Sequence, residues 1–134
     1  MAKRVLIVDD HAPTRVLIRT ILEAEKTEQF TVADAATGTD CLKAYDKQGP
    51  FDLILLDVNL PDMDGYSVCR ALRHVDKHVP IVFVTAKGDL RDYAAGREAG
   101  GDSYLVKPIA RAALRSIVNL FTSIERMGRP ADGS

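Results

Sequence analysis

The chain has 134 residues and a formal net charge of −1, with 46% of its residues hydrophobic and 28% charged. This length supports one domain with its own hydrophobic core. The near-neutral charge argues against a nucleic-acid-binding domain, which is usually distinctly basic, and no apolar run approaches the ~20 residues that span a bilayer. The apolar run before Asp9 is too short for a secretory signal, so we expect a cytoplasmic protein.

Five short apolar runs typical of β-strands recur along the chain, at residues 4–8, 30–35, 53–57, 80–85 and 103–107. The segments between them have the spacing of amphipathic helices, and a further apolar stripe covers 114–124. Residues 37–40 form a cap signal, and Pro13 and Pro108 suit the first turn of a helix. This alternation predicts five βα units that form a parallel sheet with helices on both faces.

The strands differ in how continuously apolar they are. Val5–Val8 and Leu53–Leu56 are unbroken, which is typical of central parallel strands buried on both faces. The run Phe30–Ala33 alternates with polar residues, so we expect an edge strand there. The segment 128–134 is polar and contains glycine and proline, which predicts a flexible tail or the start of a linker.

Polar or charged side chains follow four of the strands where each strand ends. They are Asp9, Asp10, Asp57, Thr85 and Lys107. Because parallel strands end at one edge of the sheet, these groups are expected to share a pocket. Three carboxylates so close together repel one another, so one pKa rises or a divalent cation binds, and oxygen ligands suit Mg²⁺. The residues make Asp57 a candidate nucleophile; the alternative is a structural cluster of ion pairs.

Four separated motifs resemble the receiver domain of two-component response regulators. They are Val8–Asp10, Leu56–Gly65, Val84–Ala86 and Tyr104–Pro108, each at the end of a predicted strand and in the family's order. The likeness covers residues 3–127. It implies a flavodoxin-like (βα)5 fold with a doubly wound parallel sheet in the order 2-1-3-4-5. It also implies a cis peptide before Pro108.

The resemblance implies a role for each residue of the cluster. Asp57 would accept a phosphoryl group from a sensor histidine kinase or a histidine phosphotransfer protein. Asp9, Asp10, Asp57 and the main-chain carbonyl of Asn59 would hold Mg²⁺. Lys107 would neutralise phosphoryl oxygens, and Thr85 would donate a hydroxyl hydrogen bond to them. Such a domain is not a conventional enzyme, but it catalyses its own phosphorylation and dephosphorylation.

Tyr104 matches the family's switch aromatic, which turns inward when Thr85 moves toward the phosphoryl group. The segment 93–101 is helical in composition but lightly anchored, and it contains Gly96. The signal is then expected on the last helix–strand–helix segment, where a downstream effector protein or a fused output domain would bind. No direct contact with nucleic acid or membrane is expected. The alternative for Tyr104 is a fixed, half-buried core ring.

Three alternative functions were weighed for this sequence. A phosphorylation-independent pseudo-receiver would have the same fold and bind proteins only. A flavodoxin would need a phosphate cradle rich in serine, threonine or glycine after the first strand, and a haloacid-dehalogenase-type phosphatase would need a D-x-D motif there. Asp9-Asp10 provides neither. Asp62 and Asp64 are expected to be loop and helix-start groups, with Asp64 as the cap of the next helix.

Overall fold

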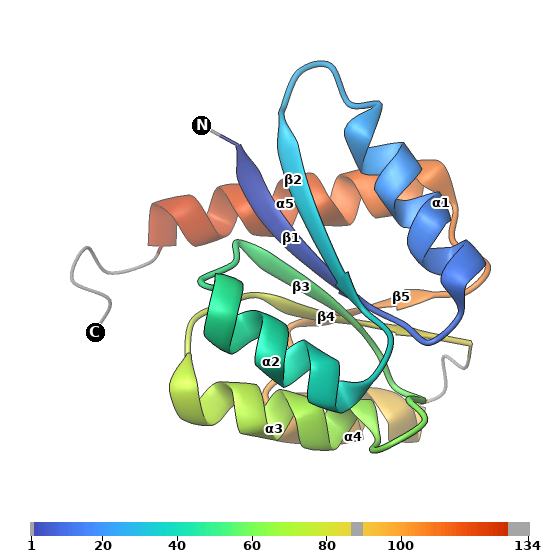
Figure 1. Ribbon diagram of the computed structural model, residues 1–134, viewed down its shortest axis with the longest axis vertical. Coiled ribbons are helices and arrows are strands. Elements are labelled where there is room, and N and C mark those ends of the chain that lie inside the picture. The colour runs from blue at the N-terminus through green and yellow to red at the C-terminus, as the bar shows by residue number, and fades with distance from the viewer. Residues whose placement is uncertain (1, 87–89, 129–134) are drawn as a thin grey trace.

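Strands and helices alternate along the chain in the computed structural model, which describes residues 2–86 and 90–128 (Figure 1). The strands are β1 (Lys3–Val8), β2 (Phe30–Ala35), β3 (Leu53–Asp57), β4 (Ile81–Thr85) and β5 (Ser103–Val106). The helices are α1 (Ala12–Glu23), α2 (Gly38–Gln48), α3 (Gly65–Val75), α4 (Leu90–Ala99) and α5 (Arg111–Gly128). The predicted five βα units are therefore confirmed.

The strands form one parallel sheet in the order β2-β1-β3-β4-β5, as predicted. Strand order reverses at β1, which has β2 on one side and β3 on the other. In open α/β sheets, ligands bind beyond the carboxyl ends of the strands at such a reversal. The register places Val8 beside Leu56, so the residues that follow β1 and those that end β3 are neighbours.

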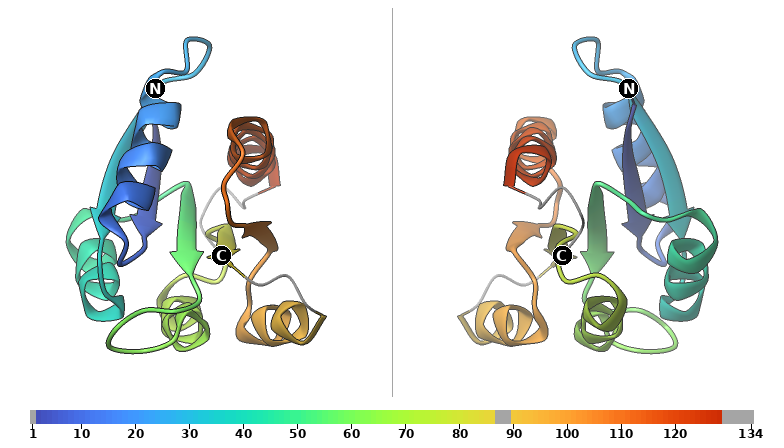
Figure 2. Two further views of the ribbon diagram at one scale, coloured as in Figure 1. Left: turned by 90° about the vertical axis from the view of Figure 1, so that its right-hand side faces the viewer. Right: turned by 90° about the vertical axis from the view of Figure 1, so that its left-hand side faces the viewer.

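Helices cover both faces of the sheet, and the alternation of side chains along β1 divides the core into two parts. Val5 and Ile7 pack with α1 and α5 on one face, whereas Leu6 and Val8 pack with α2 and α3 on the other. Figure 2 shows this division from two sides, with α4 on the same side as α2 and α3. All five residues of β3 and of β4 are buried, as expected for central strands.

Local signals fix two of the helix starts, as predicted. The Thr37 hydroxyl accepts a hydrogen bond from the Asp40 N–H at the start of α2, and Asp64 accepts one from the Ser67 N–H at the start of α3. Pro13 lies in the first turn of α1. Pro108 does not lie in a helix: α5 begins only at Arg111, and the Lys107–Pro108 peptide is cis. Among the described residues, no helix is long and apolar enough to cross a membrane.

Candidate functional site

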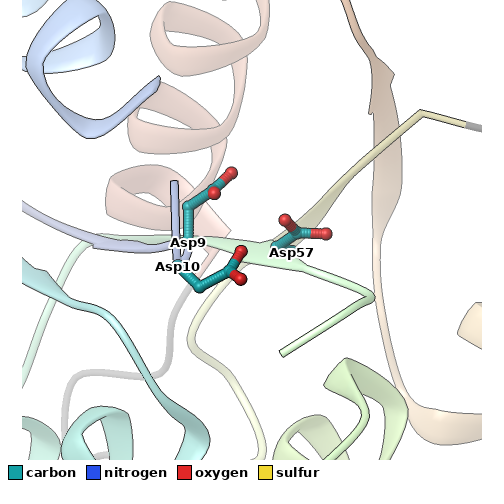
Figure 3. Close-up of side chains that lie close together, drawn as sticks. All are labelled: Asp9, Asp10 and Asp57. Atoms are coloured by element: carbon teal, nitrogen blue, oxygen red, sulfur yellow. The ribbon is translucent and has the colours of Figure 1, made fainter. Parts of the chain in front are cut away.

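Three carboxylates meet at the carboxyl edge of the sheet, where β1 and β3 end (Figure 3). Asp9 and Asp10 follow β1 directly, and Asp57 is the last residue of β3. One oxygen from each lies within 4.8 Å of the others. Asp9 is only 1% exposed and Asp57 only 4%, whereas Asp10 is exposed. The pocket therefore combines two buried acids with one that solvent reaches.

Lys107 directly follows the edge strand β5 and brings a positive charge to this cluster. Thr85 is paired with Val106, and the Lys107 N–H donates to the Thr85 carbonyl at 2.7 Å, so β5 ends beside β4. The Lys107 Nζ lies 2.9 Å from Asp9 Oδ2 and 3.0 Å from Asp57 Oδ2. The sheet register thus places one ammonium between two buried carboxylates.

Each buried acid uses one carboxylate oxygen within its own loop and directs the other toward Lys107. Asp9 Oδ1 accepts the His11 N–H at 2.8 Å, and Asp57 Oδ1 accepts the Asn59 N–H at 3.0 Å. The buried Asp9 Oδ2 has the Lys107 ammonium as its partner. Because a carboxylate oxygen has two lone pairs, this oxygen can accept a further partner.

The charges of the cluster shift the pKa values of its members. Burial raises the pKa of Asp57, the Asn59 N–H and Lys107 oppose that rise, and the negative charge of Asp9 adds to it, so the net pKa is raised. Burial lowers the pKa of Lys107, but its contacts with Asp9 and Asp57 outweigh burial and raise it. Lys107 therefore stays protonated at neutral pH, and ionising Asp57 costs the fold free energy.

The donor set fits a small, hard cation. All three groups offer carboxylate oxygens, and one Lys107 ammonium cannot balance three carboxylates. Mg²⁺ prefers oxygen ligands and retains several waters, so a few protein ligands suffice. Asn59 lies two residues after Asp57, and its N–H donates to Asp57 Oδ1.

Thr85 and Tyr104 lie on β4 and β5, and only Thr85 is at the carboxyl edge. Thr85 ends β4 and is buried. Tyr104 is half-buried and belongs to an aromatic group, with ring centroids 5.4 Å from Phe83 and 4.5 Å from Tyr93. Its hydroxyl lies 3.2 Å from that of Tyr66. Tyr104 therefore lies on the strand that leads to Lys107, within an aromatic group.

Two polar contacts near the site have no signal in the sequence. Arg15 on α1 donates to the Asp9 carbonyl at 2.6 Å, and Asp62 accepts the N–H groups of Gly38 and Thr39 at the start of α2. Asp62 thus caps a helix that precedes it in the chain. The contact of Asp62 joins segments 24 residues apart, so no local pattern could have revealed it. Asp64 caps α3, as the sequence predicted.

Comparisons with known proteins agree on one family. A family model for the response regulator receiver domain matches residues 5–119. Transcriptional regulatory protein AfsQ1 of Streptomyces coelicolor is 47% identical over 110 residues, which are 81% of this chain and 46% of that protein. Transcriptional regulatory protein PrrA of Mycobacterium tuberculosis is 37% identical over 131 residues, 98% of this chain and 54% of that protein.

Solved structures give the same result. A response regulator receiver domain protein (CheY-like) from Methanospirillum hungatei superposes with a TM-score of 0.85 at 28% identity, covering 95% of this chain and 98% of that one. The chain spans about half the length of the curated relatives it matches. The similarity to these curated relatives therefore covers most of this chain but only about half of each relative.

The raised pKa of Asp57 predicts how stability depends on pH without metal. The folded protein binds a proton at Asp57 more tightly than the unfolded chain does, so the free energy of unfolding falls as pH rises from near 4 through the raised pKa. Asn resembles the protonated acid. Asp57→Asn should therefore be more stable than wild type at pH 7, by about 1 kcal/mol, and the gain should vanish near pH 4.

Urea unfolding at pH 4 and pH 7 in the presence of EDTA measures this difference. Asp62→Asn is the control. Hydrogen bonds lower the pKa of Asp62 to about 2, so removing this carboxylate should destabilise the fold at both pH values. A variant at Asp57 that is less stable than wild type at pH 7 would contradict the assigned direction of the Asp57 pKa shift.

Proposed function

Because this chain belongs to the response regulator receiver domain family, we propose that Asp57 accepts a phosphoryl group from a sensor histidine kinase or a histidine phosphotransfer protein. One observation carries the assignment to this residue. Asp57 is a buried carboxylate at the end of β3, with Oδ2 3.0 Å from the Lys107 ammonium and two further acids within 4.8 Å. A group meant only for stability would gain nothing from such crowding.

The proposed reaction is an in-line phosphoryl transfer. Asp57 Oδ1 is held by the Asn59 N–H, so Oδ2, which faces Lys107, is the oxygen that attacks phosphorus. A phosphorus–oxygen bond forms, the bond from phosphorus to the donor imidazole breaks, and that nitrogen retains the electron pair and takes up a proton. Positioning and charge neutralisation contribute most to such transfers, which suits a site made of fixed charges.

The other residues of the pocket supply the neutralising charge. Asp9, Asp10, Asp57 and the carbonyl of Asn59 would hold Mg²⁺, which neutralises the phosphoryl oxygens when bound. The Lys107 ammonium, already between two carboxylates, exchanges its Asp57 contact for a phosphoryl oxygen. The Thr85 hydroxyl, at the adjacent strand end, donates to another of these oxygens. The domain thereby promotes its own phosphorylation and dephosphorylation.

The length of the curated relatives supports the proposed partners, because these proteins are about twice as long as the part that matches this chain. This chain matches about half of proteins that are named transcriptional regulatory proteins. We expect the receiver domain, residues 3–127, to signal to a downstream effector protein or a fused output domain through the face formed by α4, β5 and α5. Contact with nucleic acid would belong to that output part. A cytoplasmic location suits a partner of the kinase domain of a sensor.

A small acyl phosphate tests the proposed acceptor. With Mg²⁺ and acetyl phosphate, wild-type protein should gain the mass of one phosphoryl group, since the pocket holds the acceptor oxygen beside its counter-charge. Asp57→Asn should gain none. Asp10→Asn leaves the acceptor in place but removes a proposed metal ligand, so it should be phosphorylated more slowly. Intact-mass spectrometry distinguishes the three proteins.

Two outcomes would contradict the proposal. An unchanged mass gain in Asp57→Asn would move the acceptor elsewhere. No gain in wild type, with its kinase also present, would favour the pseudo-receiver, a protein-binding module of the same fold that accepts no phosphoryl group.

The proposed signal path runs through Tyr104, and the ring of this residue lies close to Gly96 on α4. The Tyr104 ring lies over the α4 backbone at Gly96, so that a Cβ there would come within 2.8 Å of the ring carbons Cε1 and Cζ. Glycine at this position therefore leaves space for the tyrosine, in addition to weakening the helix. Tyr66 and Tyr93 hold the same ring from α3 and α4.

This contact predicts a coupling between the two residues. In wild type, Gly96→Ala should destabilise the fold by about 1–3 kcal/mol, because the methyl group overpacks against Tyr104. In a Tyr104→Ala background, the same substitution should stabilise it by about 1 kcal/mol through helix propensity. Urea unfolding of the four proteins measures the cycle. Equal effects of Gly96→Ala in both backgrounds would show that the contact carries no energy.

A further inference from the structure

The loop between β3 and α3, residues 58–64, is fastened at both its base and its tip. At the base, the Gly65 N–H donates to the Val58 carbonyl at 2.7 Å, and Asn59 pairs with Asp64 in an antiparallel bridge. The Asn59 N–H also donates to Asp57 Oδ1. The base of the loop is therefore bonded directly to the proposed phosphoryl acceptor through Asn59.

The tip of the loop is bonded to a different element, the first turn of α2. Asp62 Oδ1 accepts the Gly38 N–H at 2.8 Å, and Oδ2 accepts the Thr39 N–H at 2.9 Å and the Thr39 hydroxyl at 2.7 Å. These hydrogen bonds lower the pKa of Asp62 to about 2. The carboxylate therefore stays ionised, and the tie stays intact, throughout the neutral pH range.

An apolar contact supports the same tie. Met63, the neighbour of Asp62, packs so closely on α2 that a Cβ at Gly38 would lie 2.8 Å from its Sδ and 2.9 Å from Val68 Cγ2. Met63 is partly buried against the core face that α2 and α3 share. Two consecutive loop residues, one charged and one apolar, thus rest on the same turn of α2.

We propose that Asp62 is a positioning residue for the metal and phosphoryl site. Its bonds to Gly38 and Thr39 hold the loop tip against α2, so that the Asn59 carbonyl and the Asp57 carboxylate keep the spacing that a cation requires. Groups that orient metal ligands from outside the coordination sphere commonly control metal affinity. The inference rests on the proposed function, since it assigns Asn59 to the same cation. A helix cap alone would leave cation affinity unchanged.

The test is Mg²⁺ binding to unphosphorylated protein, measured by titration calorimetry at pH 7. Asp62→Asn should weaken binding about tenfold, because the amide has only one acceptor oxygen and cannot accept from Gly38 as well as from Thr39. Asp40→Asn is the matched control: it removes one negative charge from the first turn of α2, the turn that Asp62 contacts, and the Asp40 side chain has no hydrogen bond or ion pair among the described residues. It should change the dissociation constant less than twofold.

Thr39→Val breaks the tie from the α2 side without changing charge. It should weaken Mg²⁺ binding in the same direction as Asp62→Asn, by a smaller factor, because the Thr39 N–H still donates. Urea unfolding confirms that each variant is folded at the titration temperature. Binding to Asp62→Asn or Thr39→Val as tight as to Asp40→Asn would overturn the positioning role. No binding to wild type would instead overturn the proposed metal site itself.

Discussion

The arrangement of charge at the carboxyl edge of the sheet is the constraint on which the rest of this structure depends. Three carboxylates lie within 4.8 Å of one another, two of them are buried, and one ammonium lies between those two. Such a cluster is costly, because buried ions lose hydration and like charges repel. The fold tolerates it because Lys107 and the loop N–H groups of His11 and Asn59 offset part of the cost. The remaining negative charge makes the pocket a place for a cation.

The topology of the sheet is what gathers these groups. β1 and β3 are adjacent and parallel, so residues far apart in the chain end side by side, and β4 and β5 extend the same edge. β3 and β4 have no polar residue before their last position. The core therefore stays apolar up to the edge, where the polar residues begin. The buried sheet is therefore a rigid support, and chemistry is confined to the residues just beyond it. The aromatic group around Tyr104 lies on the same support and connects β4 and β5 to α3 and α4.

Much of this could be predicted from the sequence, for a physical reason. A buried parallel strand needs an unbroken apolar run, so the runs and their terminal Asp9, Asp57, Thr85 and Lys107 are visible in the chain itself. The family resemblance added the strand order. Contacts between elements were not predictable, because no local periodicity encodes them: the bonds from Asp62 to α2 and from Tyr66 to Tyr104 join distant segments. Gly96 was interpreted as a weak point of a helix, whereas its contact with Tyr104 requires the packed structure to be seen.

The most direct test of this account is whether the carboxylate cluster binds a divalent cation on its own. Amide chemical shifts followed during a Mg²⁺ titration report on each residue separately. The account predicts saturable shifts for the amides of Asp10, His11 and Asn59 at millimolar Mg²⁺, lost in Asp10→Asn, with little change at the exposed acid Glu23. Shifts that are absent, or that do not saturate and are equal at all exposed acids, would contradict it, because the crowded carboxylates would then be balanced by Lys107 alone.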